Sequence, residues 1–182
     1  LDRVEEAKKT CYAAIKINSK YTSAYINLGK YELRTSNLKQ ALSVFQRALQ
    51  IEPESANISF EIGNALASEH YYKQSISFYQ QSIKHTKNFF AAHFNLALAY
   101  SELNDHDNAI KQYKKALLID EQSFEALNNL GNVYKDIYLW DHASSCYEQA
   151  LAIKPDYTDA INNLAVLYSL NAKVRDLAHP IS

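Results

Sequence analysis

The sequence is poor in the residues that usually mark turns between short elements. Its 182 residues include three glycines, three prolines and no methionine. Turns between β-strands draw heavily on glycine and proline, so this scarcity argues against an all-β or loop-rich fold. The expected fold class is all-α.

A concentrated charge of one sign is also missing. Lys and Arg number 19 against 20 Asp and Glu, which gives a formal net charge of −1, and no basic run occurs. Nucleic-acid binders normally concentrate basic side chains against phosphates, so no nucleic acid is expected as a partner. No apolar run reaches the roughly 18 to 20 residues that span a bilayer. The chain also does not open on a basic region followed by an apolar core, and no membrane association is expected.

Cysteine is rare as well. Cys11 and Cys146 lie far apart, without the spacing of metal ligands. This pattern favours two reduced thiols in a reducing intracellular compartment such as the cytoplasm. No Gly-rich phosphate loop, Ser/His/Asp set or paired carboxylates can be found, so we expect no metal, no cofactor and no catalytic site.

What the sequence does have is a repeat of 34 residues that needs no gaps. Small residues form two columns, which are Ala7, Ala41, Ser75, Ala109 and Ala143, and then Ala14, Ala48, Ser82, Ala116 and Ala150. Between them runs the column of Cys11, Phe45, Tyr79, Tyr113 and Tyr147. All three glycines fall in one further column of Gly29, Gly63, Ala97, Gly131 and Ala165. A period of this length predicts a solenoid in which each unit buries its apolar face against its neighbours.

The columns predict that each repeat is a hairpin of two helices, called helix A and helix B. Small residues let two helix axes approach closely, and the column between them lies on the same helical face and fills the remaining space. In the repeat that begins at Thr22, we expect helix A over about 23–35 and helix B over about 38–49, with Pro53 ending the unit.

The same register divides the chain into a single array. Residues 1–21 form a half repeat with helix B alone, full repeats occupy 22–55, 56–89, 90–123 and 124–157, and 158–182 is a half repeat or capping segment. We expect the last helix A to end near residue 170. Because terminal repeats need a polar cap, self-association through the exposed half repeats is a further expectation.

One known family shows this pattern. The residues Leu130, Gly131, Tyr134, Ala143, Tyr147, Ala150 and Pro155 stand at the offsets of the tetratricopeptide repeat (TPR), and the chain resembles that family over almost its whole length. The resemblance implies an α-solenoid wound as a right-handed superhelix, whose concave groove is lined by helix A and binds extended peptides or partner helices. Glu32 departs from the pattern, because it occupies the usual aromatic position of helix A.

Side-chain amides follow the expected groove. Counted from the start of each repeat, position 6 reads Asn27, Glu61, Asn95, Asn129 and Asn163. Positions 5 and 9 add Asn64, Asn128, Asn132 and Asn162. An amide both donates and accepts, so such a row can pair with the backbone of an extended peptide without demanding a sequence. The row is similar to the asparagine ladder of the TPR superhelix of O-linked N-acetylglucosamine transferases. The alternative is that these amides only order the helix surface.

Charged and aromatic residues complete the predicted site. The groove charges are mixed, and Glu61 stands where the TPR domains that clamp chaperone C-termini require asparagine, so we expect no carboxylate clamp. Phe60 and Phe94 either offer an apolar pocket to a partner or pack between helices. The predicted peptide-binding set is Asn27, Lys30, Arg34, Phe60, Asn64, Phe94, Asn95, Asn128, Asn129, Asn132, Asn162 and Asn163.

These observations predict a scaffold or adaptor that binds a protein segment in its groove. The alternative is the substrate-recruiting or regulatory arm of a larger enzyme, for example a glycosyltransferase, whose catalytic domain lies outside this sequence.

Overall fold

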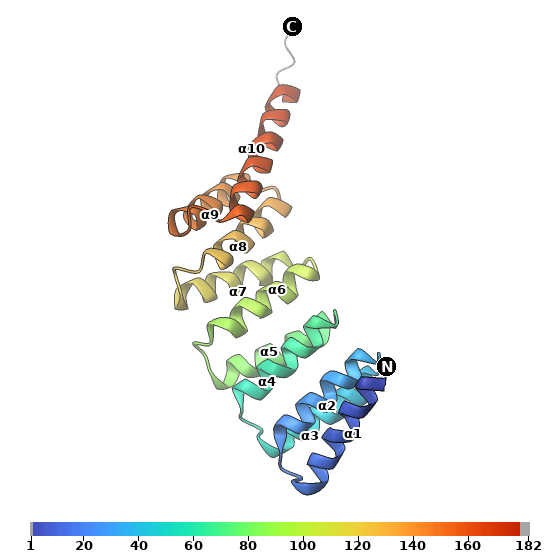
Figure 1. Ribbon diagram of the computed structural model, residues 1–182. Helices are drawn as coiled ribbons and strands as arrows, with labels where there is room; N and C mark the ends of the chain where they lie inside the picture. Colours follow the sequence, from blue (N-terminus) through green and yellow to red (C-terminus); the bar gives the residue numbers. More distant parts are fainter. Residues whose placement is uncertain (1, 179–182) are drawn as a thin grey trace. The chain divides into compact units, whose positions relative to one another are not determined.

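The computed structural model describes residues 2–178, with side chains described for 3–170, and this part of the chain holds ten α-helices and no strand. The helices are α1 (Asp2–Ile17), α2 (Thr22–Arg34), α3 (Leu38–Ile51), α4 (Ala56–Ser68), α5 (Tyr72–His85), α6 (Phe90–Glu102), α7 (His106–Ile119), α8 (Phe124–Asp136), α9 (Trp140–Ile153) and α10 (Thr158–Ala178) (Figure 1). The all-α prediction is confirmed.

The chain forms two compact units. Unit 1 comprises Leu1–Ala99 and holds α1 to α5 with most of α6, while unit 2 comprises Tyr100–Ser182 and holds the end of α6 with α7 to α10. Within unit 1, α2 packs against α3 and α4 against α5, and within unit 2 α8 packs against α9 (Figure 1). Each of these pairs is a hairpin of the kind that the repeat predicts. The exact division into repeats stays a prediction.

The helices begin and end close to the expected residues, with one exception. Helices α2 and α3 lie within two residues of the ranges expected for helix A and helix B. Each A-to-B turn contains one residue with a positive φ, and these are Ser36, His70, Asn104 and Tyr138 at 59°, 63°, 56° and 62°. Ala172 stands at the equivalent place in α10 and is helical, so α10 continues to Ala178 and does not turn near residue 170. Alanine is the strongest helix former, which favours this continuation.

The small-residue columns form the seam of each hairpin. Ala41, Ala48, Ser75, Ser82, Ala109, Ala116, Ala143 and Ala150 are all 0% exposed. The glycine column lies against the aromatic one: a Cβ atom on Gly63 would stand 2.6 Å from Cε1 of Tyr79, and one on Gly131 would stand 2.6 Å from Cε1 of Tyr147. At these two places a side chain could be added only if the ring or the helix backbone shifted.

Three serines are fully buried in the packing of unit 1, and two of them lack a hydrogen-bond partner among the described residues. Ser75 donates its hydroxyl to the carbonyl oxygen of Tyr72 at 2.9 Å. The Oγ atoms of Ser59 and Ser82 are buried and have no hydrogen-bond partner among the described residues. A buried hydroxyl without a partner is unfavourable, since folding removes its hydrogen bonds to water. The segment 56–89 therefore packs less favourably than the alanine columns of the other repeats.

A buried ion pair explains the departure at Glu32. Lys8 Nζ lies 3.1 Å from Glu32 Oε2, and the side chains of the two residues are 11% and 6% exposed. Lys8 also donates to Thr35 Oγ1 at 3.1 Å, and Asn37 Nδ2 donates to the Glu32 carboxylate at 3.3 Å. Burial opposes the charge on Lys8, but the side-chain bonds to Glu32 and Glu5 outweigh it and raise the pKa of Lys8. A lysine on α1 thus compensates the carboxylate that replaces an aromatic residue on α2.

Candidate functional site

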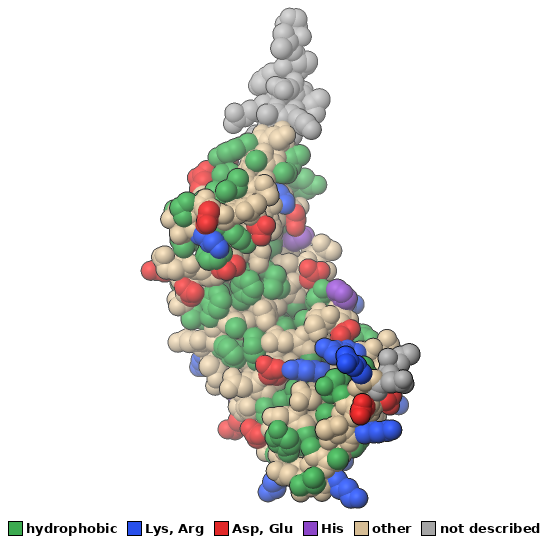
Figure 2. Space-filling view, in the orientation of Figure 1, with side chains coloured by type: hydrophobic (Ala, Val, Ile, Leu, Met, Phe, Trp, Pro, Cys, Tyr) green, Lys and Arg blue, Asp and Glu red, His purple; other side chains and the backbone are tan. Residues whose placement is uncertain are grey.

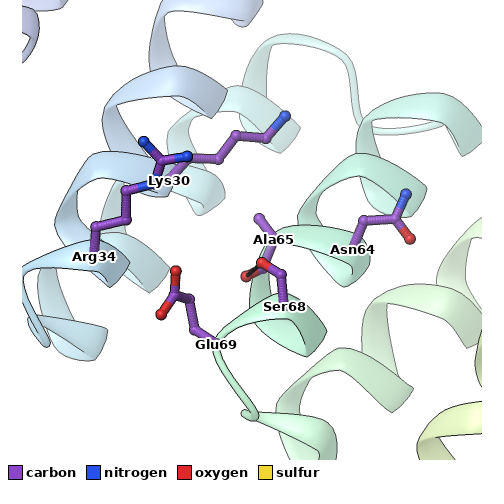
Figure 3. Close-up of a pocket in the computed structure, with 6 residues that line it drawn as sticks. All are labelled: Lys30, Arg34, Asn64, Ala65, Ser68 and Glu69. Atoms are coloured by element: carbon purple, nitrogen blue, oxygen red, sulfur yellow. Dashed lines mark hydrogen bonds between the residues drawn. The ribbon is translucent and has the colours of Figure 1, made fainter.

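A pocket of about 360 Å³ lies in unit 1 on the surface of α2 and α4. Its lining consists of Lys30, Arg34, Asn64, Ala65, Ser68 and Glu69. Lys30 and Arg34 extend from α2 toward α4, and Glu69 points back toward α2 (Figure 3). The structure therefore brings together three residues of the predicted set. The other lining residues, Ala65, Ser68 and Glu69, were not in the predicted set.

The charges around this pocket are mixed. Lys30 Nζ donates to Glu61 Oε2 at 2.8 Å, and both side chains are well exposed, at 38% and 49%. An exposed ion pair of this kind contributes little to stability. The Arg34 guanidinium lies 5.9 Å from the centre of the Tyr31 ring. Basic and acidic side chains are interspersed on the displayed face of unit 1 (Figure 2), so the surface does not select strongly for a ligand of one charge.

Asparagine side chains form a hydrogen-bonded group beside the pocket. Asn64 Oδ1 accepts a hydrogen bond from the Tyr79 hydroxyl at 3.0 Å and another from Asn95 Nδ2 at 2.7 Å. Asn64 and Asn95 are both partly exposed. The group links α4, α5 and α6, so these amides are fixed in position at the surface.

A second group of amides lies in unit 2. Asn132 Oδ1 accepts from the Tyr147 hydroxyl at 2.8 Å, and Asn128 Oδ1 accepts from Asn163 Nδ2 at 2.9 Å. Asn128 Nδ2 makes a longer contact of 3.5 Å with Asn129 Oδ1. Asn128 is only 3% exposed, so its side chain is closed to a ligand in this structure. Its amide is enclosed because α10 packs against α8 and covers it.

The remaining predicted residues are not joined to these two groups. Asn27 and Asn162 are exposed on α2 and α10. Phe60 is half-buried, with its ring centre 4.8 Å from that of Phe89 and 6.0 Å from that of Tyr79. Phe94 is also half-buried and stacks on Phe90 with the ring centres 5.8 Å apart. Of the two interpretations of the phenylalanines, these contacts favour packing within the fold.

The buried tyrosines hold part of this hydrogen-bonded surface, and the sequence analysis did not include them in the predicted set. Burial raises the pKa of Tyr79, Tyr113 and Tyr147 well above the usual range. Their rings fill the seam, while the Tyr79 and Tyr147 hydroxyls reach the asparagine that precedes each by fifteen residues. The constant separation between Asn64 and Tyr79 and between Asn132 and Tyr147 was a signal available in the sequence.

The described residues contain no group of three or more His, Cys, Asp or Glu side chains that could hold a metal ion. None of the helices combines the length and apolar character needed to cross a bilayer.

Models of known families match most of this chain. Models described as tetratricopeptide repeat match residues 26–84, 78–111 and 126–161, and one described as TPR repeat matches residues 99–137. The chain belongs to the tetratricopeptide repeat (TPR) family. No curated protein matches it.

Solved TPR structures resemble the chain at low sequence identity. YrrB, a TPR protein described as having an unusual peptide-binding site, gives a TM-score of 0.71 at 21% identity over 88% of this chain and 83% of its own. MamA gives 0.71 at 21% identity over 85% and 91%. The first TPR of Spaghetti (RPAP3), bound to the HSP90 peptide SRMEEVD, gives 0.63 at 21% identity over 65% and 94%. These likenesses show the TPR fold, a helical repeat solenoid.

Proposed function

We propose that this TPR chain is a protein-interaction scaffold that binds an extended polypeptide along its helix A surfaces, chiefly through the peptide backbone. The observation that carries the proposal is the pair of amide groups, in which partly exposed asparagines are held at fixed positions in both units. The descriptions of YrrB and RPAP3 as peptide-binding or peptide-bound proteins support it. In this proposal the chain itself is not an enzyme.

Backbone recognition suits the chemistry of this surface better than recognition of a charged peptide. Amides can meet both the N–H and the C=O groups that any extended peptide presents. The pocket beside Asn64 mixes Lys30 and Arg34 with Glu69, which disfavours a strong preference for either sign. None of the described contacts favours the alternative, an arm of a larger enzyme, over a scaffold.

The binding role predicts that several amides must be removed before affinity falls clearly. Replacing Asn95, Asn129 and Asn163 with alanine should weaken binding by roughly 1.5 to 4.5 kcal/mol if the three effects add, because each hydrogen bond contributes about 0.5 to 1.5 kcal/mol. Asn129 and Asn163 both contact Asn128, so these two losses can couple. The measurement is calorimetry with a blocked 15-residue peptide selected on the wild-type chain from a random library. Circular dichroism of the variant checks that helical content is retained.

Matched variants separate this mode from others. Gln46→Ala removes an exposed amide from helix B and should leave affinity unchanged. If the partner were an amphipathic helix seated on the phenylalanines, a Phe60→Ala, Phe94→Ala variant would lose binding while the triple asparagine variant would keep it. Unchanged affinity in the triple variant would end the backbone-binding proposal, and loss of its fold would assign the amides a structural role.

A reducing intracellular compartment, such as the cytoplasm, belongs to the same proposal. Cys11 and Cys146 are free and buried. Burial raises the pKa of Cys146 to about 11 and also raises the pKa of Cys11. Both groups are therefore protonated, weakly reactive thiols at neutral pH, which supports a role in packing and not in disulfide formation.

We further propose that the chain self-associates through the apolar face of α10. Ile161 is 45% exposed, whereas Ser59 and Leu127 at the same repeat position are 0% and 6% exposed. Tyr168 is 54% exposed, whereas its equivalents Leu66 and Tyr134 are 0% and 6% exposed. Helices α4 and α8 bury these positions, so the face on α10 is apolar surface that association would remove from water.

Light scattering after size-exclusion chromatography, over a concentration series, tests this self-association. The wild-type mass should rise with concentration, while an Ile161→Glu, Tyr168→Glu variant should remain a monomer. Asn162→Glu, at an exposed polar position of the same helix, is the control and should behave as the wild type. A wild-type chain that stays monomeric at millimolar concentration would contradict the proposal.

A further inference from the structure

The same arrangement of an asparagine and a tyrosine occurs once in each unit. In unit 1 the Tyr79 hydroxyl donates to Asn64 Oδ1, and in unit 2 the Tyr147 hydroxyl donates to Asn132 Oδ1. Both asparagines stand at position 9 of helix A, and both tyrosines belong to the buried column of helix B. In the repeat 22–55 the column residue is Phe45, which has no hydroxyl, and position 9 is Lys30.

The hydrogen bonds decide which end of each amide remains for a ligand. Asn64 Oδ1 accepts from Tyr79 and from Asn95, which occupies both of its lone pairs. Asn132 Oδ1 accepts from Tyr147. Within the described residues, no protein group accepts from Nδ2 of Asn64 or of Asn132, and both side chains are partly exposed. What Asn64 offers a ligand is therefore its pair of N–H donors, and Asn132 offers the same two donors beside one remaining lone pair of Oδ1.

We infer that Tyr79 and Tyr147 are positioning residues for peptide binding: they hold the amides of Asn64 and Asn132 so that donors face the ligand, and the groups bound there are main-chain carbonyl oxygens. This inference rests on the proposed peptide-binding function. It adds that the protein side chains are the hydrogen-bond donors and the peptide carbonyl oxygens are the acceptors. Lys30 and Arg34 line the pocket beside Asn64 and are also donors only, so they favour the same kind of ligand atom.

The two units differ in how firmly the amide is held, which gives an internal comparison. Asn132 Oδ1 depends on Tyr147 alone among the described contacts, so removal of that hydroxyl frees the amide to rotate by 180° and present its oxygen. Asn64 Oδ1 still accepts from a second donor, Asn95 Nδ2. If the Asn64 amide rotated, its own Nδ2 would face Asn95 Nδ2, and this contact between two donors is unfavourable. Tyr147→Phe should therefore affect binding more than Tyr79→Phe.

A double-mutant cycle tests whether Tyr147 acts through Asn132. The probe is a blocked 15-residue peptide selected on the wild-type chain from a random library, and affinity is measured by calorimetry. Tyr147→Phe should weaken binding by about two- to tenfold, the value of one hydrogen bond. In an Asn132→Ala background the same change should have no further effect. Phenylalanine is compatible with this place in the seam, since Phe45 occupies the equivalent one.

Nuclear magnetic resonance supplies a readout that needs no ligand. The side-chain NH2 signals of Asn132 should shift and exchange faster with solvent in Tyr147→Phe, whereas those of Asn64 should change little in Tyr79→Phe. Tyr25→Phe, which removes a hydroxyl bond to the Ser19 carbonyl oxygen, is the control and should leave both amides and the affinity unchanged.

The outcomes separate this inference from the function on which it rests. A wild-type chain that selects no peptide defeats the proposed function and the inference with it. A chain that binds peptide but loses equal affinity from Tyr147→Phe with or without Asn132 defeats the inference alone, because the tyrosine would then act through general stability. Unchanged affinity in Tyr147→Phe, or unchanged Asn132 NH2 signals, has the same consequence.

Discussion

Gly131→Ala is expected to lower the free energy of unfolding of unit 2 by about 1 to 3 kcal/mol. A Cβ atom at this position would stand 2.6 Å from Cε1 of Tyr147, and the Tyr147 ring is 0% exposed and enclosed by the seam. The ring or the backbone of α8 must shift, which overrides the gain in helix propensity that alanine usually brings over glycine. Chemical denaturation followed by circular dichroism measures the change.

Ala165→Gly is the matched control. Ala165 stands in the same column as Gly131, and it is exposed on α10, so the same two residue types are exchanged without a ring beside them. It should cost only about 0.5 to 1 kcal/mol, the ordinary penalty of glycine inside a helix. A stability gain in Gly131→Ala would contradict the close packing of Tyr147 on α8.

Lys8→Leu is expected to destabilise unit 1 by about 3 kcal/mol, the lower end of the range for breaking a buried ion pair. The change leaves Glu32, whose side chain is 6% exposed, without its cation, although Asn37 still donates to the carboxylate. The value is read from urea denaturation of the full chain.

The double variant Lys8→Leu, Glu32→Leu should recover most of the lost stability. The equivalent positions of the next repeat carry Leu42 and Leu66, which shows that an apolar pair fits the same space. Replacement of a buried ion pair by apolar residues of similar volume is often neutral or stabilising. A double variant no more stable than Lys8→Leu would show that the charge of Glu32 is not the source of the loss.

The hairpins could be predicted because their contacts recur at a fixed separation along the chain. Each seam joins residues whose spacing is the same in every repeat, so the columns of alanine, glycine and tyrosine report helix pairing directly. The Lys8 and Glu32 contact occurs once and has no column, which is why Glu32 could be noticed as a departure but not explained. Helix α10 continues because the A-to-B turn expected near residue 170 does not form. The repeat pattern marks where turns occur in the other hairpins, but it does not mark where one is missing.

The site was harder to predict than the fold. Helical periodicity places a residue on one face of a helix, but it does not give the exposure or the hydrogen bonds of its side chain. The pattern placed Asn64, Asn95 and Asn128 on one strip, yet Asn128 is 3% exposed while the other two are partly exposed. Asn128 is buried because α10 packs on α8 there, and the pattern within one helix does not report such a contact from another helix. The direction of each amide depends on hydrogen bonds from other helices, and the tyrosine hydroxyls that supply them were assigned only to packing.

The Lys8 and Glu32 pair also gives the array an order that its repeated apolar seam could not supply. Helices that carry the same small and aromatic columns are nearly interchangeable as partners, so a chain of such hairpins is exposed to pairing in the wrong sequence during folding. Burial of the Glu32 carboxylate is favourable only where the neighbouring helix supplies a positive charge. At the place of Lys8, helices α3, α5 and α7 carry Leu42, Ile76 and Ile110. The buried charge of Glu32 therefore favours α1 over these three helices as the neighbour of α2.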